Sequence, residues 1–104
     1  MATNVLAPID IEINQQKVVM SKLQLQIRTV ITNFWNMPPK ERARNISEIQ
    51  KSLEAFNRFF DKLKSANIQN TGSRFAADNL KQSFFSVQAQ WRKFETSLNS
   101  TQAG

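Results

Sequence analysis

The segment Lys40-Glu41-Arg42-Ala43-Arg44, directly after Pro38-Pro39, is the part of the chain whose residue types and spacing carry the most chemical information. Three cations within five positions could bind phosphates or the carboxylates of an acidic partner. The two prolines suit the first turn of a helix, where positive charge opposes the helix dipole and costs a little stability. Cations at this position break a local rule of helix stability without visible compensation, and such a position is a candidate functional site.

The rest of the chain lacks the residues that most catalysis requires. Histidine, cysteine and tyrosine are absent, which removes the commonest general base, the thiolate nucleophile, disulfides and the commonest metal ligands. There is no glycine-rich phosphate loop, and no serine lies in a glycine-rich elbow. We therefore predict a protein that is not an enzyme, with no catalytic residue, cofactor, metal site or small-molecule substrate.

Three stretches with helical spacing of apolar residues must position the cations. In the central stretch, 45–64, the apolar residues alternate in steps of three and four, with polar residues between them. The flanking stretches repeat the pattern, with Gln16 as a polar interruption in the first. The apolar rows are Ile13, Met20, Leu23, Ile27, Val30, Phe34 and Met37; then Ile46, Ile49, Leu53, Phe56, Phe60 and Leu63; then Ala77, Leu80, Phe84, Val87, Trp91, Phe94 and Leu98.

This pattern predicts one all-α domain, an antiparallel up-down-up three-helix bundle with long helices. We expect helices at about 8–36, 38–66 and 74–98, joined by the turn at Asn36-Met37-Pro38-Pro39 and by residues 67–73. Asn36 and Ser73 are the expected N-caps of the second and third helices. Residues 1–7 and 99–104 are expected to be a flexible lead and a flexible tail. The heptad spacing is equally compatible with self-association.

In an up-down-up bundle the start of the second helix lies at the same end as the last turns of the first and third. That end would gather a local net charge of +4 out of the total of +6, together with several aromatic residues. Trp35 lies off the apolar row and is expected to be partly exposed. The predicted partner-binding residues are Lys40, Arg42, Arg44, Arg92, Lys93 and Trp35.

Several apolar residues fall outside the three rows, including Val18 and Leu25. Phe59-Phe60 and Phe84-Phe85 are doublets, so one member of each must lie at the edge of its row. These residues either widen the core or form a binding surface. The candidate interface residues are Phe59, Phe75 and Phe85.

Length, charge and terminal sequence indicate the kind of partner and the location of the protein. The chain has 104 residues, a formal net charge of +6 and a pI near 10.2, values that favour an anionic partner such as nucleic acid, an acidic protein or an anionic membrane. No segment has the apolar run of a membrane span, and the N-terminus lacks the features of a signal peptide. A cytoplasmic location is expected, with signal-independent export left open.

Trp35 beside an interhelical turn, in a cysteine-free helical chain, resembles the small secreted helical-hairpin proteins of the WXG type. The motif differs, because the residues here are Trp35-Asn36-Met37, without the glycine, and a third long helix follows. No family is assigned, and no residue role is carried over.

The sequence therefore predicts a helical binding, assembly or adaptor protein that docks an anionic macromolecular partner through the basic, aromatic-flanked end. A protein partner or self-association is favoured. The alternative is sequence-nonspecific nucleic-acid binding through the same cations, which would be steeply salt-dependent. Peripheral association with an anionic membrane is the least favoured interpretation.

Overall fold

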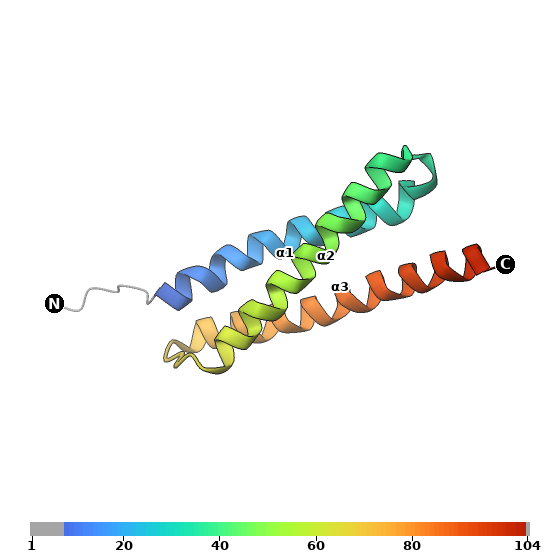
Figure 1. Ribbon diagram of the computed structural model, residues 1–104. Coiled ribbons are helices and arrows are strands. Elements are labelled where there is room, and N and C mark those ends of the chain that lie inside the picture. The colour runs from blue at the N-terminus through green and yellow to red at the C-terminus, as the bar shows by residue number, and fades with distance from the viewer. Residues whose placement is uncertain (1–7, 104) are drawn as a thin grey trace.

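The computed structural model describes the backbone of residues 8–103 and the side chains of residues 8–100. Within that range the chain is all-α, as predicted, and forms a three-helix bundle of 65 × 20 × 17 Å. Helix α1 spans Pro8–Asn33 and a short 3₁₀ helix, η1, spans Phe34–Asn36. Helix α2 spans Pro39–Lys64, and helix α3 spans Thr71–Ala103. Figure 1 shows α1 and α3 running in the same direction, with α2 returning diagonally between their ends.

The predicted apolar rows close over one another to form the core. Ile13 and Ile27 of α1, Ile49 and Phe56 of α2, and Trp91 of α3 are almost completely buried. Met37, Ile46, Leu63, Phe94 and Leu98 are partly buried against the core. Around the middle of the bundle, Phe84 packs its ring 5.9 Å from Phe56 and 5.2 Å from Phe60, measured between ring centroids. Aromatic contacts of this kind join α2 to α3.

The turn between α1 and α2 is built by the two prolines. Met37 is extended, with ψ at 144°, as expected for a residue before proline, and its N–H donates to the carbonyl of Phe34 at 3.1 Å. Pro39 occupies the first turn of α2, where its missing N–H costs nothing. Pro38, not the predicted Asn36, is the N-cap residue of α2, and its backbone carbonyl accepts the first helical hydrogen bond from Arg42.

The boundaries of α3 differ from the prediction at both ends. The helix begins at Thr71 because the Asn70 side chain accepts a hydrogen bond from the Ser73 N–H at 3.1 Å. Ser73, the predicted cap, therefore lies inside the helix. At the other end α3 continues to Ala103, so most of the stretch predicted as a flexible tail is helical. The predicted lead, residues 1–7, lies outside the described residues, as does Gly104.

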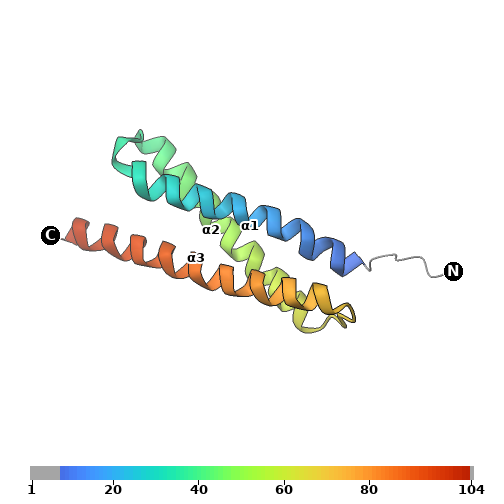
Figure 2. The ribbon, with the colours of Figure 1, turned by 180° about the vertical axis from the view of Figure 1, so that it is seen from behind.

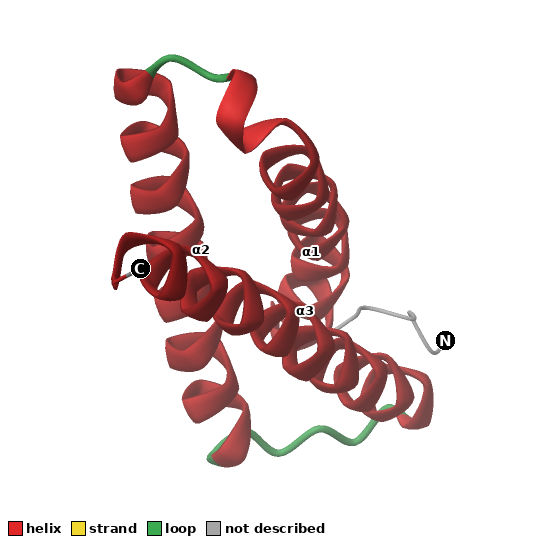
Figure 3. Cartoon of the chain, turned by 90° about the vertical axis from the view of Figure 1, so that its right-hand side faces the viewer, coloured by secondary structure: helices red, strands yellow, loops and turns green. Residues whose placement is uncertain are grey.

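The bundle is not equally tight along its length. Figure 1 and the view from behind in Figure 2 show that the corner joining α1 to α2 diverges from the C-terminal part of α3. Figure 3, turned by a quarter, shows the same separation. The corner still contacts α3 before this divergence, because Phe34 of η1 packs its ring 5.3 Å from Phe94. No described helix has an apolar stretch long enough to cross a lipid bilayer.

Candidate functional site

Arg42 is partly buried and faces the turn between α1 and α2. Its guanidinium donates to the carbonyls of Phe34 and Trp35, at 2.8 and 2.9 Å, and lies 5.3 and 5.2 Å from the centroids of their rings. The Phe34 carbonyl also accepts the Met37 N–H at 3.1 Å, so Arg42 adds a second hydrogen bond there and one to the carbonyl of Trp35. Arg42 therefore caps the end of the first helical segment and fixes Trp35 by a cation–π contact.

Trp35 is 62% exposed, as the sequence predicted for a residue off the apolar row. Its ring also meets Phe34 edge-on, with the centroids 5.1 Å apart. The exposed tryptophan is thus held on two sides, and it lies on the side of α2 to which Arg42 points.

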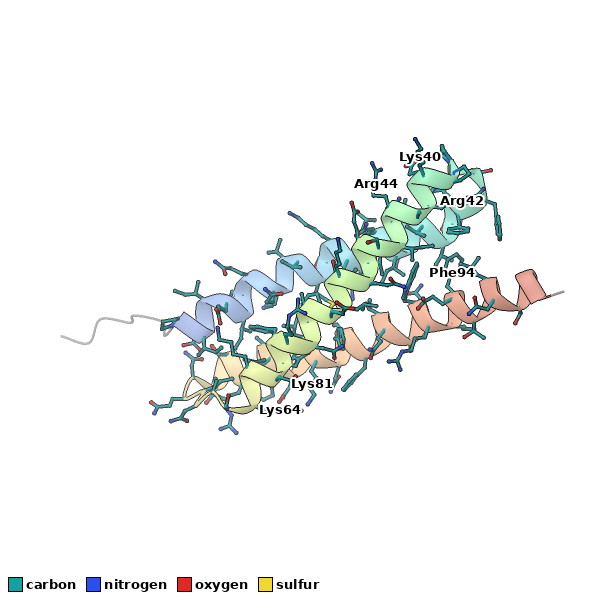
Figure 4. All side chains as sticks on the ribbon, in the orientation of Figure 1. Lys40, Arg42, Arg44, Lys64, Lys81 and Phe94 are labelled. Carbon is teal, nitrogen blue, oxygen red and sulfur yellow. The ribbon has the colours of Figure 1, made fainter. Side chains whose placement is uncertain are left out.

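Lys40 and Arg44 point the other way. Figure 4 shows both side chains on the side of α2 that faces away from α3, whereas Arg42 and Phe94 lie toward the interior of the corner. Both side chains are exposed, and neither makes an ion pair among the described residues. Lys40 and Arg44 therefore lie on the side of α2 opposite to Arg42, which contacts Trp35.

Arg92 and Lys93 are exposed on α3 and lie at a different level of the bundle. Gln50 of α2 donates to Glu95 of α3 at 3.4 Å, which aligns the two helices at that height. Lys40 lies ten residues, or about 15 Å of helix, from Gln50, and Phe34 in the corner packs its ring 5.3 Å from Phe94 of α3. The predicted cations therefore lie on two different helices, Lys40 and Arg44 on α2 and Arg92 and Lys93 on α3.

The sequence-based prediction grouped the cations by the end of the bundle at which they lie. It missed a second group of cations, which share one face of a helix. Lys40, Arg44, Lys51 and Arg58 are spaced by four, seven and seven residues, which places all of them on one side of α2. All four are exposed. This set, called here the α2 basic row, could have been found by applying to the cations the periodicity used for the apolar residues.

No carboxylate forms an ion pair with the α2 basic row among the described residues, although Glu54 lies on the same face between Lys51 and Arg58. The two ion pairs found there join Lys62 to Glu12 at 2.8 Å and Lys64 to Asp61 at 3.5 Å, and neither involves the row. Glu54 and Arg58, which have the spacing of a surface ion pair, do not form one. Glu48 instead accepts a hydrogen bond at 2.9 Å from Gln26 of α1.

The candidate interface residues behave differently from one another. Phe59 is partly buried against the core and contacts Phe60, so it widens the core. Phe75 and Phe85 are 66% and 55% exposed on the outside of α3. A further exposed row, spaced by seven, lies on the outer face of α1 and was noted in the sequence only in part: Ile11, Val18 and Leu25.

An open pocket of about 410 Å³ lies where α2 meets the connection to α3. Its lining combines Phe60 and Leu63 with the cations Lys64, Arg74 and Lys81 and the carboxylate of Asp78. Lys64 and Lys81 are labelled in Figure 4. Among the residues that the structure describes, no group of three or more acidic residues gathers where it could hold a metal ion.

The chain matches no protein-family model, no curated protein and no solved structure.

Proposed function

We propose that this chain is a non-enzymatic binding and assembly protein that docks an anionic macromolecular partner along the outer face of α2. The observation that supports the proposal is the α2 basic row: four exposed cations, aligned on one helix, without an ion pair in the described residues. Such a row creates a local positive potential that attracts and orients a polyanion. The sequence-based site is thereby revised, with Lys40 and Arg44 kept and Lys51 and Arg58 added.

Arg42 and Trp35 take a different part in this proposal. Arg42 holds the corner together, so it supports the start of the row without facing the partner. Trp35 is an exposed, immobilised aromatic on the other side of α2, where it offers an anchor to a second protein surface. Arg92 and Lys93 remain outside the proposed site.

The assembly part of the proposal rests on the exposed apolar residues of α1 and α3. Ile11, Val18 and Leu25 form a row with the seven-residue spacing of a helix-packing seam. We expect the chain to self-associate through this face, because α2 would repel a second copy of itself. Sedimentation should show a larger species that changing all three residues to serine reduces to the monomer. A wild-type chain that is monomeric at all concentrations would contradict the proposed self-association through α1.

The test of anionic docking compares two variants that lose equal charge. In the first, K40Q/R44Q/K51Q/R58Q removes the α2 basic row. In the control, K17Q/K22Q/R92Q/K93Q removes four exposed cations from α1 and α3. Binding is measured to heparin and to poly-L-glutamate, with helix content followed by circular dichroism. The row variant should bind at least about tenfold more weakly than the control variant, a difference of about 1.4 kcal/mol. Equal losses in both would mean that net charge, and not the row, is responsible.

A further inference from the structure

We infer that the α2 basic row is a binding surface for the phosphate backbone of nucleic acid, contacting no bases. This inference depends on the proposed docking function and names the class of its partner. It is carried by the juxtaposition of four unpaired cations on a helix face that has no exposed large apolar side chain.

The composition of the face selects among anionic partners. Every exposed large hydrophobic residue in the described part of the chain lies on α1, η1 or α3, and none lies on α2. A protein interface has an apolar or aromatic centre that supplies most of its binding energy. A membrane-surface helix likewise needs an apolar face to insert. The outer face of α2 offers charge alone, which is the main source of affinity for a nucleic-acid backbone.

The length of the row also fits a backbone of repeated charges. Lys40 and Arg58 are eighteen positions apart on a continuous helix, which corresponds to about 27 Å at the α-helical rise. At one phosphate per 1.7 Å of duplex axis, counting both strands, this length of duplex carries about sixteen phosphates. Because each strand winds round the duplex, four cations at intervals of about 6 to 10 Å would meet phosphates of both strands where the backbones face α2, and not successive phosphates of one strand.

Neighbouring side chains leave the row available. Lys62, the next cation along this side of α2, is neutralised by Glu12 and is not counted in the row. Glu54 is exposed beside Arg58 without pairing to it, so it opposes a phosphate there. Trp35 lies on the other side of α2, next to Arg42, and does not extend the row with a stacking surface. Binding through the row is therefore independent of sequence and of base stacking.

The experiment titrates the full chain with short DNA and RNA duplexes of unrelated sequence, and with poly-L-glutamate, between about 50 and 200 mM salt. Duplexes of all sequences should bind equally, with a log–log salt slope of about −3 to −4 for four phosphate contacts. Each single change of a row cation to glutamine should make the slope less steep by about 0.9. E54Q should tighten binding, and W35F should leave it unchanged.

Three outcomes overturn the inference, and they separate it from the proposed function. If the row variant K40Q/R44Q/K51Q/R58Q binds duplexes as tightly as the K17Q/K22Q/R92Q/K93Q control, the row is not the nucleic-acid surface. If poly-L-glutamate binds in a row-dependent way and no duplex does, the partner is an acidic protein and the docking function stands. If neither polymer binds, both the inference and the docking function are wrong.

Discussion

At the scale of single residues, Arg42 shows how one side chain can be assigned the wrong role from its neighbours in sequence. It lies between Lys40 and Arg44 in the chain, but helical geometry turns it to the opposite side of α2. There it donates to the carbonyls of Phe34 and Trp35 at the end of the first helical segment, the first of which also accepts the Met37 N–H. Arg42 is therefore a structural cation within a segment whose other cations face the solvent.

Changing Arg42 to glutamine should destabilise the corner between α1 and α2. The loss of two hydrogen bonds from a charged donor should lower the free energy of unfolding by about 1.5–3 kcal/mol. Trp35 should also lose its fixed environment, which is seen as a shift in tryptophan fluorescence. R44Q, which removes an exposed cation on the same helix, should change stability by less than about 0.5 kcal/mol. Equal stability of R42Q and R44Q would contradict the capping role.

At the scale of elements, apolar spacing predicted the buried face of each helix correctly. Each helix buries one face against the core, and the spacing of its apolar residues identifies that face. Phe56, Phe84 and Trp91 lie on these faces and are buried. Helix boundaries were less predictable, because Asn70 and Ser73 are both good cap residues and only the backbone path decides between them. The same limit explains why the α3 continuation to Ala103 was missed.

The start of α3 can be tested by comparing its two candidate caps. N70A should lower the free energy of unfolding by about 0.5–2 kcal/mol, since Asn70 accepts the hydrogen bond from the Ser73 N–H. S73A should have a much smaller effect, because Ser73 supplies only its backbone N–H to that bond. Thermal unfolding followed by circular dichroism measures both variants. A larger loss in S73A than in N70A would place the cap where the sequence alone had placed it.

At the scale of the whole molecule, the bundle determines which charges can act together. The sequence predicted one basic end. This prediction assumed that the three helix axes are aligned and that the helix ends lie at the same level. Because Lys40 and Arg44 point away from α3, they do not share a face with Arg92 and Lys93, which are exposed on α3. The cations on the outer face of α2 form the longer group, and their alignment follows from helix periodicity and not from the bundle's topology.

The excess positive charge should make stability depend on salt. With a net charge of +6 and an unpaired row on α2, repulsion within the folded chain weakens as salt screens it. The melting temperature should therefore rise between low and moderate salt; about 1 kcal/mol corresponds to roughly 4–8 °C for a domain of this size. K40Q/R44Q/K51Q/R58Q should melt higher than wild type at low salt and show a smaller rise. A melting temperature that falls with added salt would contradict this prediction.

The most direct test of docking on α2 is to follow the backbone amide signals of the chain by NMR as a polyanion is added. The changes should concentrate on the exposed side of α2 between Lys40 and Arg58, with Arg92 and Lys93 little affected. Changes centred instead on the α3 cations or on the corner at Trp35, with the outer face of α2 unaltered, would contradict the assignment of the α2 basic row as the binding surface.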